Sequence, residues 1–526
     1  MNLDEFLQSL HFDVDKVRPP DCKVDWEDAP LPYKLYQDLP AIPLSSEVPL
    51  SLIGGEAPVQ PRLREMGHFL WYGYGLTQCS QPAYALDSTG KGRGPMHRSR
   101  RFVPSGGALY PNELYLYLKM EEVPDGIYHY DVAHHRLVLL REGNFDSYLL
   151  RALGNRCDWS SCFATVFVSA VFWKNFFKYN YFSYRLQGLD AGALIGQLLE
   201  LAKRFGFVSG VCFQFLDRAV NHLLGLSEQE ESVYAVIPLS LQPVDAWFAG
   251  GSDGDGQVRD RELCRELPEI RHRHFIRSRK VKPYPMLVKM NQAAMLETMP
   301  SFQRPAGGKR VSGEGPSLTL PEADRLSYDL AAACRKRYSP GMDFFLGKVC
   351  QHQLAALLKE ATVSFAYRND LDASQEKARP RISLAGCFYG VEGIPDGAYR
   401  YDSEAHALQL LQPGDHRFSL QQGMTLHNVN LFQVPLCLHV TGDRNHLKEA
   451  LGYRGYRIQQ MEAGMLMQRL LLAASALGMG GHPLLGFDVN LSDGLYGMKS
   501  RGETCLLQIP VGPVRPHPQL QGNLHA

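Results

Sequence analysis

Two short segments carry residues suited to binding an anionic or flat ligand. Pro104-Ser105-Gly106-Gly107 precedes a strand-like run at 113–118, and adjacent glycines let the backbone approach a ligand and offer it N–H donors. Arg335-Lys336-Arg337-Tyr338-Ser339 follows a helical run at 330–334, and arginine forms charge-assisted paired bonds to phosphate oxygens. Each segment alone also fits a plainer structure, the first a turn into a strand and the second a helix C-terminus stabilised by cations.

The composition of the whole chain narrows the function classes. The 526 residues include 55 Lys+Arg and 55 Asp+Glu, and 45% are hydrophobic, which predicts two to four domains. The balanced charge argues against nucleic-acid or anionic-membrane binding, and the longest apolar run, 164–173, is too short to span a bilayer. The N-terminus lacks signal-peptide features, and eleven cysteines without a Cys-x-x-Cys pair favour reduced thiols. We therefore expect a cytoplasmic protein, and the absence of zinc-like His/Cys spacing predicts no metal site.

The sequence repeats itself once. Val123–Asp131 returns as Ile394–Asp402, 271 residues later, and Tyr184–Gln187 returns as Tyr456–Gln459, 272 residues later. A near-constant offset over more than a hundred residues indicates a tandem duplication. The predicted domains are a first copy with an N-terminal extension (1–245), a linker (246–317) and a second copy (318–526).

Each copy is predicted to contain a hairpin, a long helix and a closing strand. The Pro-Asp-Gly stretch carries a turn signal followed by alternating residues. Residues 184–205 and 456–477 show apolar side chains at helical spacing over about six turns, which is most simply core packing. Gly192 and Gly464 in these helices would permit close approach of another helix. The closing strands are expected at 233–239 and 505–511.

Taken together, the ordered motifs resemble the SagB-type (ThcOx-like) dehydrogenases of the nitroreductase superfamily. Besides Pro104 to Pro111, the motifs that carry the resemblance are Pro32–Tyr36, Tyr74–Thr77, Gly126–Asp131, Lys178-Tyr179 and Tyr184-Arg185. The resemblance covers nearly the whole chain except the linker. It implies an α+β fold in which the two copies form, within one chain, the pseudo-dimer that holds FMN between subunits. It also implies the oxidation of azoline rings of a peptide to azoles.

The resemblance further implies which residues hold FMN. In the superfamily an arginine-rich element of one subunit holds the flavin phosphate, and a Pro-Ser loop of the other subunit reaches the flavin. The matching residues are Arg335, Arg337 and Ser339 in the second copy and Ser105, Gly106 and Gly107 in the first. Gly486, in Leu485-Gly486-Phe487-Asp488, resembles the loop that passes over the flavin ring.

The opposite site of the pseudo-dimer lacks all three parts. No Lys or Arg lies between Lys34 and Arg62, and Gln375-Glu376-Lys377-Ala378 stands where the glycine loop would recur. Gln214 takes the place of Gly486, where its side chain would either crowd the flavin or form a hydrogen bond. We therefore expect one FMN per chain.

Lys178-Tyr179 resembles the pair that the SagB type uses for proton abstraction. Aromatising an azoline removes a proton from one ring carbon and transfers a hydride from its neighbour to the flavin. A lysine in a dry aromatic setting, here supplied by Phe176 and Phe177, has a lowered pKa and can act as a general base, and a tyrosine can relay the charge. Without the resemblance, Lys178 would be interpreted as a surface lysine lying over aromatic packing. The second copy has Ala450-Leu451 at this place.

Three functions follow, in order of preference. The first is an FMN-dependent azoline dehydrogenase acting on a peptide substrate, with oxygen as the electron acceptor and a cyclodehydratase complex as a partner. The second is an NAD(P)H-dependent nitro- or quinone reductase, against which Lys178-Tyr179 argues. The third is a flavin-free scaffold in a peptide-modification complex. The sequence leaves open the peptide, the choice between thiazoline and oxazoline, and whether the chain forms oligomers.

Overall fold

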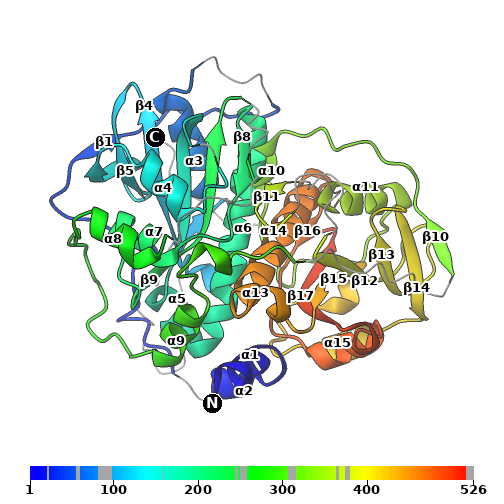
Figure 1. Ribbon diagram of the computed structural model, residues 1–526. Helices are drawn as coiled ribbons and strands as arrows, with labels where there is room; N and C mark the ends of the chain where they lie inside the picture. Colours follow the sequence, from blue (N-terminus) through cyan, green and yellow to red (C-terminus); the bar gives the residue numbers. More distant parts are fainter. Residues whose placement is uncertain are drawn as a thin grey trace, which may run out of the picture.

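The structure, a computed structural model, places two β-sheets on either side of a central pair of long helices (Figure 1). It describes residues 1–20, 23–54, 60–80, 98–157, 159–242, 247–248, 258–305, 316–362, 367–372 and 380–516. One sheet belongs to each half of the chain, and the helices pack on the sheet faces. This arrangement confirms the predicted α+β fold of two tandem copies.

The first copy forms an eight-stranded sheet in the order β1-β6-β5-β4-β7-β9-β8-β11. Its strands are β1 (Ala41–Pro43), β4 (Asn112–Met120), β5 (Val123–Asp131), β6 (Arg136–Glu142), β7 (Cys162–Val171), β8 (Val208–Val211), β9 (Glu231–Ser240) and, from the second copy, β11 (Arg368–Asn369). Neighbouring strands are antiparallel except β11, which pairs with β8 in parallel. A separate two-stranded sheet joins β2 (Leu76–Ser80) and β3 (Arg98–Arg101).

The second copy repeats this sheet with seven strands in the order β10-β14-β13-β12-β15-β17-β16. They are β10 (Ser317–Thr319), β12 (Ile382–Phe388), β13 (Gly397–Asp402), β14 (Ala407–Pro413), β15 (Leu436–Asp443), β16 (Gly480–Gly481) and β17 (Glu503–Gly512). The Pro-Asp-Gly motif precedes β13 but lies inside β5 in the first copy. There the tighter hairpin turns at 121–122, because Met120 already pairs with Val123. The predicted turn at Pro124–Gly126 is therefore wrong for the first copy.

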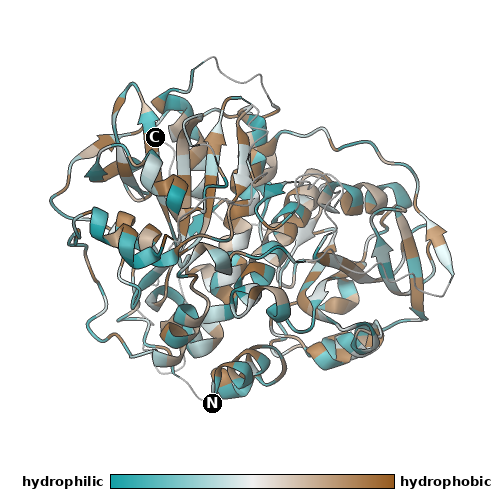
Figure 2. Cartoon of the chain, in the orientation of Figure 1, coloured by the Kyte–Doolittle hydropathy of each residue, from teal (hydrophilic) through white to brown (hydrophobic). Residues whose placement is uncertain are grey.

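The helices also recur in the same order in both copies. The first half contains α1 (Leu3–Phe12), α2 (Val14–Val17), α3 (Leu63–Tyr74), α4 (Asp146–Ala152), α5 (Trp173–Tyr179), α6 (Ser183–Arg204) and α7 (Asp217–Leu224). The linker contributes α8 (Asp260–Glu266) and α9 (Pro285–Ala293). The second half contains α10 (Leu330–Lys336), α11 (Gln351–Thr362), α12 (Arg417–Gln422), α13 (Lys448–Leu451), α14 (Arg454–Ala476) and α15 (Val489–Leu495). Hydrophobic residues concentrate in the sheets, whereas outer helices such as α8 are largely hydrophilic (Figure 2). No helix among the described residues is long and apolar enough to cross a bilayer.

The two long helices, α6 and α14, cross at glycines. A β-carbon at Gly192 would collide with the carbonyl of Met461, and one at Gly464 would collide with the carbonyl of Leu189. The predicted close approach of the two helices at these residues is thus confirmed. Because the backbones touch, the two sheets are held as one pseudo-symmetric body.

Polar side chains reinforce the helix pair where it is buried. Gln468 donates to Gln197 at 2.8 Å, and Arg469 forms ion pairs with Glu200 and Glu360. Arg185 donates to the carbonyls of Leu10 in α1 and Leu506 in β17. The N-terminal helix is thereby fastened across both copies.

Replacing Gly192 by alanine should lower the free energy of unfolding by about 2 kcal/mol or more, because the added methyl group overpacks the helix crossing. Gly494→Ala is the matched control, since Gly494 also lies in a helix and has nothing within 4 Å of its added β-carbon. That control should be neutral or stabilising by up to about 1 kcal/mol. Urea unfolding followed by circular dichroism measures both. Equal effects of the two substitutions would contradict the close crossing.

Candidate functional site

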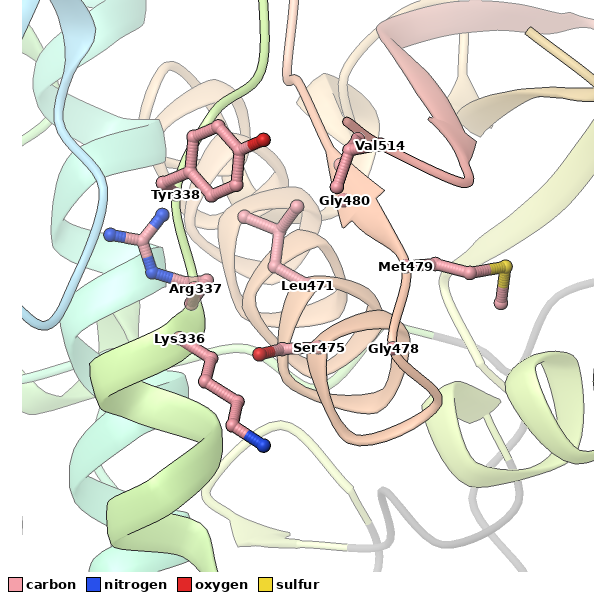
Figure 3. Close-up of a pocket in the computed structure, with 10 residues that line it drawn as sticks. Lys336, Arg337, Tyr338, Leu471, Ser475, Gly478, Met479, Gly480 and Val514 are labelled. Atoms are coloured by element: carbon pink, nitrogen blue, oxygen red, sulfur yellow. The ribbon is translucent and has the colours of Figure 1, made fainter. Parts of the chain in front are cut away.

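A cavity of about 150 Å³ lies where the end of α10 meets the end of α14 (Figure 3). Lys336, Arg337 and Tyr338 form one side, Gly478–Gly481 and Val514 the other, and Leu471 and Ser475 of α14 lie between them. Helix α10 is fixed at its start by Asp329, whose carboxylate accepts bonds from the backbone N–H groups of Ala331 and Leu52. Because Leu52 belongs to the first copy, the first copy sets the position of this second-copy helix.

Arg337 is the half-buried cation among the residues that line this cavity. Its Nε donates to the carbonyl of Phe102 at 2.8 Å, and burial lowers the pKa of its guanidinium below the usual value. Within the described part of the chain, no carboxylate pairs with Arg337 and its two Nη atoms make no hydrogen bond. This half-buried guanidinium without an acidic neighbour lies beside the cavity and points toward Phe102 of the first copy, away from Gly480 (Figure 3). A guanidinium of this kind suits a phosphate.

The other two residues of the predicted phosphate clamp lie elsewhere. Arg335 is exposed and donates to the carbonyl of Leu50 at 2.8 Å and to the hydroxyl of Tyr72 at 3.4 Å. Ser339 is exposed as well, and neither residue lines the cavity. Lys336, which the sequence interpretation passed over, lines it instead. The reason is local, since α10 ends at Lys336 and the chain then continues in extended form.

The glycine loop of the first copy is anchored by a buried carboxylate. The hydroxyl of Ser105 and the N–H of Gly106 both donate to Asp190 of α6, at 2.6 Å and 3.1 Å. Two of the donors that the sequence assigned to a ligand therefore serve to hold the loop. Burial raises the pKa of the Asp190 carboxyl to about 7, against the opposing effect of these two donors. By the repeat, Asp190 corresponds to Glu462 of the second copy.

Lys178 and Tyr179 lie directly against the glycine loop. A β-carbon on Gly107 would stand 2.5 Å from the Tyr179 hydroxyl and 2.6 Å from Lys178 Nζ. Gly107 also has φ of 65°, so both its conformation and its surroundings require glycine. The loop and the Lys-Tyr pair, more than seventy residues apart in sequence, thus form one site.

Aromatic and cationic groups of the N-terminal extension complete this site. Lys178 Nζ lies 5.3 Å from the ring centre of Trp26 and 4.8 Å from that of Tyr179. The guanidinium of Arg18 lies over the Tyr179 ring, 5.1 Å from the ring centre. Burial raises the pKa of Tyr179 to about 12, so its hydroxyl is a hydrogen-bond donor at neutral pH. No sequence pattern pointed to Arg18 or Trp26, because a contact across 150 residues depends on the fold.

The cavity and the glycine loop are joined by one interaction between the two copies. Arg337 of the second copy bonds to Phe102, three residues before Ser105 in the first. Gly486 lies further along the segment that begins at Gly478, and its carbonyl accepts from the N–H of Thr425 at 2.9 Å. Its neighbour Leu485 packs against the apolar clusters of both halves. The predicted composite site therefore draws on both copies.

Protein side chains fill the opposite, pseudo-symmetric location. Asp370 accepts bonds from the N–H groups of Phe213 and Gln214, at 2.8 Å and 2.9 Å. The side chain of Gln214 exchanges two hydrogen bonds with the backbone of Gln303 in the linker. Of the two alternatives for Gln214, the structure shows the hydrogen bond. Residues 375–378, which replace the glycine loop there, lie outside the described residues.

No group of three or more His, Cys, Asp or Glu side chains suited to a metal ion occurs in the described ranges.

The sequence matches the nitroreductase family over residues 80–239 and 391–513, more than half of the chain. The chain therefore belongs to the nitroreductase family of oxidoreductases. No curated protein matches it in sequence.

Comparison of folds agrees with this assignment. A structure from Anabaena variabilis, itself assigned as a nitroreductase, has a TM-score of 0.74 at 22% identity and covers 98% of this chain and 99% of that one. The E. coli microcin synthetase McbBCD complex with truncated pro-MccB17 bound gives a TM-score of 0.29 at 21% identity, over 35% of this chain and 65% of that one. A Ralstonia eutropha protein, also assigned as a nitroreductase, has a TM-score of 0.30 at 20% identity and covers 41% of this chain and 95% of that one. The first match extends over the whole tandem fold.

Asp190 should make stability depend on pH. The pKa of Asp190 in the folded protein, about 7, exceeds the ordinary value of 3.8. The contribution of its protonated carboxyl to the free energy of unfolding is therefore complete below about pH 4 and is lost as the pH rises through 7. The Asp190→Asn variant lacks this loss, and its stability relative to the wild type should rise by up to about 4 kcal/mol between pH 4 and pH 8. Urea unfolding of both proteins across this range measures the difference. Parallel profiles would show that Asp190 titrates normally.

Proposed function

We propose that this chain is an FMN-dependent oxidoreductase that oxidises azoline rings of a peptide to azoles. The observation that carries the proposal is the contact of Lys178 and Tyr179 with Gly107. Through Phe102 and Arg337, the same loop adjoins a cation-lined cavity suited to a phosphate. A candidate proton acceptor and a candidate flavin site thus lie next to one another.

The residues present fit FMN at its phosphate end. Arg337 and Lys336 would supply the positive charge, and the backbone of Gly478–Gly481 would allow close approach. The cavity, about 150 Å³, is smaller than a whole cofactor pocket of roughly 300 Å³ or more, which suits the phosphate end alone. Gly486 would leave room for the ring. When bound, FMN would accept the hydride that leaves the azoline carbon.

The chain's own residues would manage the proton. Lys178 Nζ would take the proton from the neighbouring ring carbon as a general base. Tyr179, kept protonated by its raised pKa, would donate a hydrogen bond to the ring heteroatom or to the peptide. Phe176 and Phe177 are buried beneath the pair, and Trp26 covers Lys178, so water is partly excluded.

One such site per chain is proposed. The opposite location is occupied by Asp370 and by the Gln214–Gln303 pair. The Lys-Tyr pair also has no counterpart, since Ala450 and Leu451 replace it. A peptide substrate, a cyclodehydratase as the source of the azoline, and a cytoplasmic location complete the proposal.

The Lys178→Ala variant should keep its FMN and oxidise a thiazoline peptide at least about 100-fold more slowly, because the general base is lost. Tyr179→Phe keeps the ring and should lose less activity. Absorbance of the bound flavin and of the thiazole product measures the two properties. Normal turnover by Lys178→Ala, or faster reduction of the wild-type flavin by NADPH than by the peptide, would overturn the assignment.

Arg337→Ala should weaken FMN binding by roughly 10- to 100-fold, the effect of removing a charged hydrogen-bond donor from phosphate. Arg335→Ala is the matched control, since Arg335 lies on the same helix end but donates to Leu50 outside the cavity. Fluorescence titration of the apoprotein with FMN gives both dissociation constants. A clamp at Arg337 is contradicted if the two variants bind FMN equally well.

A further inference from the structure

The duplication allows the same surface to be compared in two copies: the linker covers it in the first, and several apolar side chains are exposed on it in the second. The two surfaces correspond closely, because the bond from Leu216 N to the carbonyl of Ala152 recurs as the bond from Asp488 N to the carbonyl of Gly423. In the first copy this surface consists of α4, α7 and the chain between them and the sheet. In the second copy it consists of α12, α15 and the corresponding chain.

In the first copy the linker lies across this surface, extended at 296–298 and then turning through a short 3-10 helix at Met299–Ser301. Leu296 pairs with Leu216 in parallel, and its N–H donates to Asp217 at 2.8 Å. Further on, the ring of Phe302 rests on Gly154, where a β-carbon would lie 2.7 Å from the ring. Helix α8 of the linker packs beside α7 (Figure 1).

Two consecutive linker residues, Phe302 and Gln303, contact the first-copy residues that correspond to Thr425 and Gly486 of the second copy. Phe302 lies on Gly154, and Gln303 bonds to Gln214. By the repeat, Gly154 corresponds to Thr425 and Gln214 to Gly486. In the second copy these two residues are also neighbours, joined by the bond from Thr425 N to the Gly486 carbonyl.

The second copy exposes apolar side chains on this surface. We name as the apolar patch the exposed residues Met342 (63% exposed), Phe345 (37%), Leu346 (52%), Phe418 (66%), Leu426 (61%) and Phe432 (42%). Bonds from Arg417 to the Phe432 carbonyl and from Leu346 N to Gln433 join its parts. Leu426 directly follows Thr425, so the patch begins at the rim of the candidate flavin site.

We propose that the apolar patch binds the substrate peptide, in extended form, by an apolar side chain next to the azoline. The inference rests on the proposed function, and the occupant is deduced from the linker. A peptide that places its reactive ring at Gly486, where the first copy holds Gln303, brings the adjacent side chain to Leu426, where the first copy holds Phe302. Burying that side chain against Leu426 and Phe418 removes apolar surface from water on both partners.

The test compares two fluorescein-labelled octapeptides that carry one thiazole, which cannot be oxidised further, flanked either by phenylalanine or by serine. Fluorescence anisotropy with the FMN-loaded full chain should give at least about ten-fold tighter binding of the phenylalanine peptide. The double variant Leu426→Ser with Phe418→Ser should lose this preference. The matched control, Phe275→Ser with Ile276→Ser, removes exposed apolar residues of the linker and should keep it.

Three outcomes overturn the inference. Equal binding of the two peptides by the wild type, or an unchanged preference in the patch variant, removes the patch from substrate binding. A wild-type dimer that the patch variant dissociates in sedimentation experiments identifies the surface as a contact between two copies of the chain. Unchanged FMN content and melting temperature show that the variants fold. A retained binding preference without oxidation of the corresponding thiazoline peptides would refute the azoline activity but leave the docking site intact.

Discussion

The close crossing of α6 and α14 is the constraint on which the rest of the structure depends. Gly192 and Gly464 bring the backbones of the two helices into contact, so the copies cannot shift relative to one another without overpacking or opening the core. The rings of Tyr184 and Tyr456, which are related by the repeat, stack at the start of these helices with their centres 5.8 Å apart. Every contact that joins the candidate site across the two copies relies on this fixed geometry.

The candidate functional site and the location related to it by the repeat differ in their residues, although the surrounding fold is the same. At one, the guanidinium of Arg337, which pairs with no carboxylate among the described residues, lies beside a small cavity, and the glycine loop meets Lys178 and Tyr179. At the other, Glu462 takes the place of Asp190 but binds Arg381 and Tyr367, and Asp370 and Gln303 saturate the backbone and side chain of Gln214. At the opposite location, protein groups thus pair with the backbone N–H and the side chain of Gln214, the residue that corresponds to Gly486.

Segments outside the repeat make the two halves unequal. The N-terminal extension brings Arg18 and Trp26 to the Lys-Tyr pair, and the linker covers the surface of the first copy that corresponds to the exposed apolar patch of the second. The bond from Arg185 to Leu10 holds the N-terminal segment, and the bonds between Gln303 and Gln214 hold the linker. The molecule therefore shows how one peptide segment lies on this surface in the first copy.

The sequence alone determined the duplication, the α+β class and the long helices, and it showed that Gly192 and Gly464 would permit a close helix contact. It could do so because periodicity and turn residues are local properties of the chain and a constant offset is visible when the sequence is compared with itself. It also singled out Arg337, Gly107 and Lys178, whose residue types suit the proposed chemistry. Only the tertiary structure decided that Ser105 and Gly106 bond to Asp190, that Arg335 and Ser339 lie outside the cavity, and that Lys178 meets Gly107. The physical reason is that hydrogen-bond partners and helix ends are set by packing between distant segments, and sequence spacing carries no record of which donor the fold leaves free.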